Sequence, residues 1–396
     1  MLSRFQSWRT KKAWQIPREN DLPLRSELFS LDQLIHHAKK LAESHKVFIK
    51  PGSNRLLACL DENEKSLRAF NRETLAVDET RRITHAAEWL LDNFYLIEEQ
   101  IQLARRHLPK SYSRELPRLL DGSSARLPRV YDIVLELISH VDAQVDVESL
   151  SAFIKSYQTV HPLKLGELWA IPIMLRLGLI ENLQRVAERL KIARQHRDEA
   201  DLWMTRLQDV AETNPSHLVV VMAELAQSDP SLSSSFVAEF CQRLSRQRQE
   251  MHWVRNWLEQ RLSEQGEVTE RLIHQESETQ AADQVSISHS INSLRMLGGM
   301  EWGEFVETMS VVDETLRKDP TGVYARMDFA TRDAYRHAIE RVARQGNLPE
   351  WDAAEIALDL AETSAAKEGL AARSAHVGYY LIDKGRPLLD AAGRVR

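Results

Sequence analysis

Residues 168–180 read LWAIPIMLRLGLI and form the most apolar run of the chain. The run is apolar on nearly all sides of a helix, which predicts a helix at the centre of the core. Pro172 removes one backbone hydrogen bond, so we expect a kink there. The run is shorter than the ~20 residues that cross a membrane and contains Arg176, which argues against a membrane span. An amphipathic pattern follows through Leu190 and extends the helix.

Helix signals also dominate the sequence before this run. Ser30 and Gln33 have the spacing of a capping box, and apolar residues at helical spacing follow them. A long helix is expected from an N-cap at Asp78 to about His107. Pro128 then opens another amphipathic helix.

The second half of the chain gives similar signals. Asn214 and Pro215 predict a helix start. The following segment, 218–227, reads LVVVMAELAQ and has the β-branched residues of a strand, but its flanks are helical and we expect a helix. Thr331 is expected to cap a later helix, and Gly346 is expected just past its end.

These patterns together predict the fold class. The sequence has no fixed repeat period and no hairpin turn with alternating flanks. We therefore expect an all-α fold, an irregular multi-helix array with long amphipathic helices and no β-sheet. The expected divisions are a basic and aromatic tail at 1–20, a helical N-terminal subdomain at 21–213 and a helical C-terminal subdomain at 214–396.

Composition excludes several classes of protein. Hydrophobic residues make up 43% of the 396 residues and charged residues 28%, which is typical of a globular chain rather than a disordered one. The net charge of -6 gives no indication of a nucleic-acid partner. The two cysteines, Cys59 and Cys241, cannot provide a disulfide framework and are expected to be buried free thiols in a reducing cytosol.

The N-terminal residues 1–18, MLSRFQSWRTKKAWQIPR, combine five basic residues and three aromatic rings with no acid. This composition attracts an anionic lipid surface, so contact with such a surface is one interpretation. The alternative is a tail whose aromatic rings cover a neighbouring protein surface. Because no secretory signal is present, we expect a cytoplasmic chain, which lipid contact through residues 1–18 would make peripheral to a membrane.

Motifs for catalysis are missing from the sequence. Neither phosphate-cradling glycine loop occurs, nor does a G-x-S-x-G nucleophile elbow, an H-E-x-x-H pattern or a D-x-D pair. We therefore expect no catalytic residue, no cofactor and no metal ion in this chain.

Some residues nevertheless merit attention as binding or partner contacts. Glu167, Trp169 and Arg176 lie in or beside the most apolar helix. A buried charge that loses its partner costs about 3–5 kcal/mol, so an ion pair within the protein is expected. A binding groove is the alternative.

Two more pairs are candidates for contacts. Trp253 and Trp257 are four residues apart on one helix face, where they form either a stacking platform for sugar or ordinary packing. Asp328 and Arg332, with Asp333, surround a helix start, where capping and local pairing compete with a partner contact.

His140, Asp142 and Asp146 have a spacing that metal ligands can adopt. Capping explains Asp146, and the negative end of a helix dipole explains His140, so no metal is expected here.

Several long stretches carry a resemblance to a known family. They are 92–118, DNFYLIEEQIQLARRHLPKSYSRELPR; 128–186, PRVYDIVLELISHVDAQVDVESLSAFIKSYQTVHPLKLGELWAIPIMLRLGLIENLQRV; 319–345, DPTGVYARMDFATRDAYRHAIERVARQ; and 376–389, HVGYYLIDKGRPLL. Together they resemble the N-terminal, pre-membrane region of bacterial cyclic β-1,2-glucan synthetases, from about residue 20 to 390.

The resemblance implies a role in glucan synthesis. Members of the family are large inner-membrane proteins that build cyclic β-1,2-glucan from UDP-glucose through a membrane-embedded glycosyltransferase domain. The family's catalytic motifs match no position of this chain, which is expected to be either a fragment or a free-standing relative.

The sequence therefore leads us to expect a non-catalytic helical domain that supports assembly or glucan-chain handling. Its expected partner is the membrane glycosyltransferase portion of the same system, with β-1,2-glucan as a further ligand. UDP-glucose would be the donor of the full-length family rather than a ligand of this chain. The alternatives are a stand-alone carbohydrate-binding or scaffold module and, third, an independent enzyme.

Overall fold

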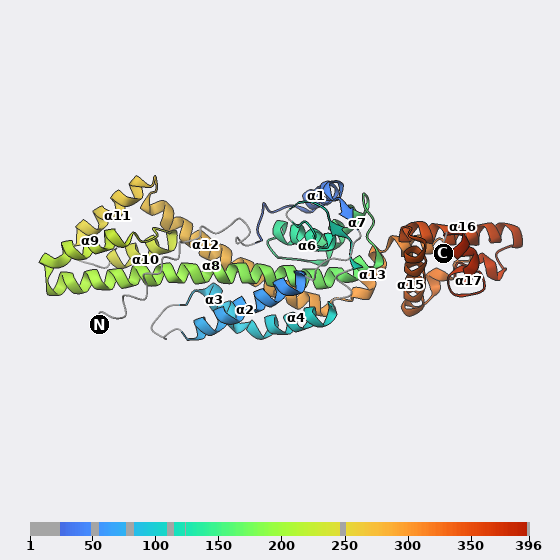
Figure 1. Ribbon diagram of the computed structural model, residues 1–396, viewed down its shortest axis with the longest axis horizontal. Helices are drawn as coiled ribbons and strands as arrows, with labels where there is room; N and C mark the ends of the chain where they lie inside the picture. The colour runs from blue at the N-terminus through green and yellow to red at the C-terminus, as the bar shows by residue number, and fades with distance from the viewer. Residues whose placement is uncertain are drawn as a thin grey trace. The chain divides into compact units, whose positions relative to one another are not determined.

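The computed structural model describes residues 24–48, 55–76, 83–108, 115–122, 124–245 and 251–393. The predicted all-α class is confirmed, because helices account for most of this part of the chain (Figure 1). The expected tail at 1–20 lies outside the described residues. The elements are α1 (Leu31–Ser44), β1 (Val47–Phe48), α2 (Arg55–Leu75), α3 (His85–Asp92), α4 (Phe94–His107), β2 (Arg118–Leu119), α6 (Arg129–His140), α7 (Val147–Gln158), α8 (Leu165–Thr213), α9 (Leu218–Ser228), α10 (Ser234–Ser245), α11 (His252–Glu264), α12 (Thr269–Gly299), α13 (Trp302–Met309), α14 (Val311–Leu316), α15 (Phe329–Gly346), α16 (Glu350–Glu368), α17 (Gly378–Ile382) and α18 (Arg386–Ala392).

The chain divides into two compact units that are not continuous in sequence. Unit 1 contains residues 60–99 and 180–292 with the segment that ends at Arg25, and unit 2 contains 26–59, 100–179 and 293–396. Helices α2, α4, α8 and α12 contribute residues to both units. The subdomain bounds expected from the sequence, 21–213 and 214–396, remain a prediction.

Unit 1 has a hydrophobic core built on the second half of α8. Ala200, Met204 and Leu207 follow one another at helical spacing and are fully buried. They belong to one cluster with Met251, which precedes α11, and with residues of α9, α10, α11 and α12, namely Leu218, Val221, Leu225, Phe236, Val237, Phe240, Leu244, Val254, Leu258, Leu262 and Leu272.

In unit 2, the first half of α8 lies against α6. A Cβ atom added at Gly178 would lie 2.7 Å from Cδ1 of Ile138, so a glycine permits this close approach. Helix α1 packs on α7 and α6 through Leu34, Ala38 and Ala42. The predicted capping box is confirmed: Gln33 N–H donates to Ser30 Oγ at 3.4 Å, and Ser30 N–H donates to Gln33 Oε1 at 2.8 Å.

The last helices of unit 2, α14 to α18, share a second core (Figure 1, orange to red). It is rich in alanine and tyrosine and includes Ala353, Ala357 and Tyr335. Arg336 is fully buried at its edge, where Nη1 donates to Glu307 at 2.8 Å and to Asp313 at 2.9 Å. These carboxylates satisfy a charge that burial would otherwise penalise heavily.

The expectation of no β-sheet was wrong in one detail. Strands β1 and β2 form an antiparallel pair of two residues each, with Val47 opposite Leu119 and Phe48 opposite Arg118. Each lies between helices, where backbone groups have no helical partner, and pairing satisfies them. Two residues are too few to produce an alternating pattern that a sequence could reveal.

The long helix expected from Asp78 to about His107 is interrupted at Asn93, and Asp78 lies outside the described residues. Asn93 adopts φ −106° and ψ 11°, and its side-chain amide donates to the Trp89 carbonyl at 2.8 Å. An asparagine side chain competes in this way with the backbone for helical partners, so α3 ends and α4 begins.

Two further details of helix ends differ from expectation. The N-cap of α15 is Asp328, whose Oδ1 accepts the Thr331 N–H at 2.9 Å, and not Thr331 itself. The left-handed residue after the helix is Asn347, with φ +50°, rather than Gly346.

The expectation of two buried thiols was wrong for Cys59, which is exposed, and Cys241 is half-buried.

The sequence also predicted a helix over 218–227 and a kink at Pro172. Residues 218–228 do form a helix, despite their β-branched residues. Helix α8 continues through Pro172. Within the described ranges, no helix combines the length and the apolar character that crossing a membrane requires.

Candidate functional site

Glu167, at the N-terminal end of α8, is the most deeply buried of the charged residues that the sequence indicated. The Glu167 side chain is fully buried, and both its oxygens accept hydrogen bonds from Arg129, each at 2.7 Å. Glu167 Oε2 also accepts the Lys164 N–H at 3.0 Å, and Arg129 Nη2 donates to the Pro162 carbonyl at 2.9 Å. Glu167 therefore has a bidentate partner within the protein.

Further polar groups extend from Arg129. Its guanidinium carbon lies 5.9 Å from the Tyr157 ring centroid, and the Tyr157 hydroxyl lies 2.9 Å from Nδ1 of His45. The other ring nitrogen of His45 is 3.0 Å from Asp132 Oδ2. Burial raises the pKa of Tyr157 to about 12, so the phenol stays protonated at neutral pH. Burial alone would lower the pKa of Arg129, but the charge of Glu167 and its hydrogen bonds raise it above the ordinary value.

Glu350, which the sequence analysis did not single out, completes this end of α8. Its Oε2 accepts the Leu165 N–H at 2.8 Å, one of the amides that a helix start leaves without a helical partner. Burial raises the pKa of Glu350 to about 7. Because 185 residues separate Glu350 from Leu165, no local pattern could have indicated the contact.

Arg176 and Glu167 have separate partners. Arg176 donates to Gln100 at 2.9 Å, to the Pro172 carbonyl at 3.0 Å and to the Leu297 carbonyl at 3.3 Å, and burial lowers its pKa. Trp169 is half-buried. The three residues predicted together in this helix thus do not converge on one groove.

The two predicted tryptophans in α11 have different environments. Trp253 is 61% exposed, with its ring centroid 4.6 Å from that of His252. Trp257 is half-buried and packs against the core of unit 1. Only Trp253 of the pair is therefore open to a ligand.

Asp328 and Arg332 lie at the start of α15 and have partners nearby. Asp328 caps the helix, and the hydrogen bonds from Thr331 lower its pKa. Arg332 forms two hydrogen bonds with Glu307, at 2.6 and 2.8 Å. The Arg332 bonds, with those of Arg336, hold the pKa of Glu307 at about 2 against the opposing effect of burial. Capping and pairing account for both predicted residues.

Two of the stretches that carried the family resemblance meet in unit 2. Asp319 begins the stretch 319–345, and His376 begins the stretch 376–389. The Asp319 carboxylate accepts hydrogen bonds from His376 Nδ1 at 2.9 Å and from the Val377 N–H at 3.0 Å. The Thr321 hydroxyl donates to the same carboxylate. Although burial opposes it, these donors lower the pKa of Asp319.

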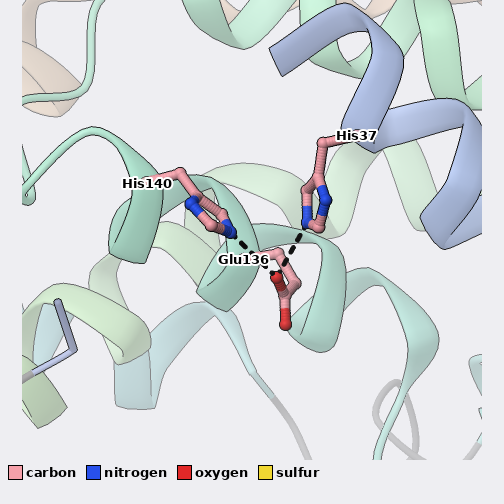
Figure 2. Close-up of side chains that lie close together, drawn as sticks. All are labelled: His37, Glu136 and His140. Atoms are coloured by element: carbon pink, nitrogen blue, oxygen red, sulfur yellow. Dashed lines mark hydrogen bonds and ion pairs between the residues drawn. The ribbon is translucent and has the colours of Figure 1, made fainter. Parts of the chain in front are cut away.

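A cluster of possible metal ligands joins α1 and α6. His37, Glu136 and His140 place one ligand atom each within 4.8 Å of the others (Figure 2). The Nε2 atoms of His37 and His140 lie 2.9 and 3.5 Å from Glu136 Oε2. The spacing in the sequence grouped His140 with Asp142 and Asp146, but Asp146 caps α7 by accepting the Ser149 N–H at 2.8 Å. The distance of His37 along the chain concealed the cluster.

Comparison with known proteins identifies a relative of this chain. No family model matches the chain. The chain is 33% identical over 372 residues to the cyclic beta-(1,2)-glucan synthase NdvB of Rhizobium meliloti (strain 1021). The match covers 93% of this chain but spans only 13% of the synthase, a share consistent with an N-terminal region. The predicted resemblance is confirmed, and the chain is related to a cyclic glucan synthase.

Proposed function

We propose that this chain acts as a non-catalytic helical region of a cyclic β-1,2-glucan synthesis system and supports assembly or glucan-chain handling. The similarity to a cyclic glucan synthase over nearly the whole chain carries the proposal. Transfer of glucose from UDP-glucose is then the task of the membrane glycosyltransferase portion.

The buried charges of unit 2 support a role in structure over a role in chemistry. Glu167 and Arg129 form a closed bidentate pair, and Arg332 and Glu307 form another. A group that performs acid–base chemistry must reach the proton it transfers, whereas these side chains are engaged with each other.

The proposed location is the cytoplasmic side of the inner membrane, against the transferase portion. Residues 1–18, which lie outside the described part of the chain, would contribute attraction to anionic lipid through their basic and aromatic side chains.

Co-purification tests the proposal. The 396-residue chain and the membrane transferase portion of a related synthase are expressed separately, one with an affinity tag. We expect a complex at micromolar concentration and no turnover of UDP-glucose by the chain alone. Lack of association would contradict the docking role, and turnover by the purified chain would contradict the non-catalytic role.

A stand-alone carbohydrate-binding module is the second candidate, which the 61% exposure of the Trp253 side chain favours. Calorimetric titration with β-1,2-glucan oligomers separates the candidates. Binding that Trp253→Ala abolishes, without affinity for the transferase, would favour the module. Tyr95→Ala is the matched control, because Tyr95 is an equally exposed aromatic residue of unit 1, at 65%.

A further inference from the structure

The contact between His140 and Glu136 brings two hydrogen-bond acceptors to face each other. His140 Nδ1 lies 2.7 Å from the Glu27 carbonyl oxygen, which can only accept a hydrogen bond, so Nδ1 must carry the proton. In neutral imidazole the other nitrogen, Nε2, then has a lone pair. That lone pair faces Glu136 Oε2, a second acceptor, at 3.5 Å. Two acceptors at this distance repel each other unless a proton or a metal ion lies between them.

Contacts within the protein fix the orientation of the His140 ring. The segment before α1 runs along the end of α6, where Ser26 N–H donates to the Ser139 carbonyl at 3.0 Å and Phe29 N–H to the His140 carbonyl at 3.1 Å. The Phe29 ring stacks on His140 at 3.8 Å and 7°. A backbone carbonyl that binds the far nitrogen of a histidine is the usual second partner of a metal-ligating imidazole.

The position of the cluster in the fold also favours a cation. His140 is the last residue of α6, at the negative end of the helix dipole. Glu136 lies one turn earlier on the same face, and His37 approaches from α1 (Figure 2). His37 Nε2 is 2.9 Å from the same oxygen of Glu136 that His140 faces.

We propose that His37, Glu136 and His140 form a three-ligand zinc site that joins α1 to α6. Two imidazoles and one carboxylate are ligands that zinc accepts, with bonds of about 2.0–2.2 Å. Tetrahedral geometry then requires ligand atoms about 3.3 Å apart, and the observed separations of 2.9 and 3.5 Å bracket this value. The third pair, the two histidine nitrogens, lies within 4.8 Å, so zinc binding would draw the His37 ring closer to that of His140.

The exposure of the ligands leaves the fourth position to water. The His37 side chain is 26% exposed and that of Glu136 34%, whereas that of His140 is 10% exposed. One side of the cluster thus faces solvent, as an open coordination position requires.

Zinc titration of the metal-free 396-residue chain by calorimetry tests the proposal. We expect a one-to-one complex and a rise in Tm with zinc concentration, because an ion that binds only the folded state stabilises it. X-ray absorption of the complex should show nitrogen and oxygen ligands only. His37→Gln and Glu136→Gln should each lower the affinity by at least about tenfold.

His36→Gln is the matched control, since His36 is the exposed neighbour of His37 on α1. It should bind zinc as the unmodified chain does. Circular dichroism without metal should show all three variants folded, since Gln preserves the size of Glu and much of that of His. Absence of zinc binding in the unmodified chain would overturn the proposal. Equal affinity in the unmodified chain and in Glu136→Gln would overturn it as well.

Discussion

At the scale of single residues, the buried Arg129–Glu167 pair should be important for the stability of unit 2. Glu167→Gln removes one charge and leaves Arg129 buried opposite a neutral amide. Loss of one member of a buried pair costs about 3–5 kcal/mol, because the remaining charge keeps its desolvation penalty. Urea unfolding followed by circular dichroism measures the change.

The exposed pair of Lys46 and Asp121 provides the control, with side chains 71% and 55% exposed. Lys46→Ala should change the free energy of unfolding by less than about 1 kcal/mol, since water screens an exposed pair. Similar losses for the two substitutions would contradict the assignment of Arg129–Glu167 as a buried ion pair.

Glu350 should make stability depend on pH. Its pKa of about 7 in the folded protein exceeds the ordinary value of 4.5, so the folded state retains a proton that the unfolded state releases. Its contribution is therefore present at low pH and lost as pH rises from about 4.5 to 7, by up to about 3 kcal/mol. Glu350→Gln keeps an acceptor for the Leu165 N–H but cannot ionise.

Thermal unfolding of both proteins across this pH range tests the sign. The variant should gain stability relative to the unmodified chain as pH rises, with the difference constant above about pH 7. Glu355→Gln, at an exposed position of α16, controls for the loss of a carboxylate. A difference that shrinks with rising pH would exclude the raised pKa.

At this scale the sequence identifies a residue more readily than its partner. Glu167 and Arg176 were conspicuous because each interrupts an apolar pattern, and buried charges need partners. The partners Arg129 and Gln100 lie 38 and 76 residues away along the chain. His37 was not considered at all, because only the packing of α1 on α6 brings it to His140.

At the scale of elements, Gly346 should be needed for the contact between α15 and the end of α18. A Cβ atom at Gly346 would overlap the backbone oxygen of Gly393, which cannot rotate away as a side chain can. Alanine adds up to about 1 kcal/mol of helix propensity. We expect the clash to outweigh it and Gly346→Ala to destabilise the chain by about 1–3 kcal/mol.

Gly298→Ala is the control for this substitution. Gly298 lies in α12, is exposed, and has open space where the Cβ would be. Alanine there should stabilise by about 0.5–1 kcal/mol, so the two variants should shift the urea midpoint in opposite directions. A stabilised Gly346→Ala protein would show that α18 does not pack as described.

Helix signals were reliable where one residue type determines the conformation. The Ser30–Gln33 capping box formed as predicted, since both side chains reach the backbone within one turn. The break at Asn93 was missed because apolar residues continue at helical spacing on both sides of it. The pairing of β1 with β2 was missed because a two-residue strand has no periodicity.

At the scale of the whole molecule, the order of residues in the chain does not match the order in which they pack. The core of unit 1 combines Met204 and Leu207 with Phe236 and Phe240. In unit 2, Leu165 N–H donates to Glu350, and Val145 N–H donates to Ser293 Oγ at 3.0 Å. A sequence suggests domains as continuous segments, whereas both units here recruit residues from each side of residue 213.

This interleaving leads to a prediction for fragments 21–213 and 214–396. Division after residue 213 separates Met204 from Phe240 and Leu165 from Glu350, so each fragment should expose the core residues that the other fragment covers. Apolar surface of this kind drives aggregation, and we expect neither fragment to unfold cooperatively when expressed alone. The two fragments are then co-expressed, one with an affinity tag, and should purify as a complex. The complex should have the circular dichroism spectrum of the undivided chain and unfold at a similar midpoint. Either fragment showing a reversible, cooperative transition by itself would contradict the interleaved cores and support the continuous subdomains expected from the sequence.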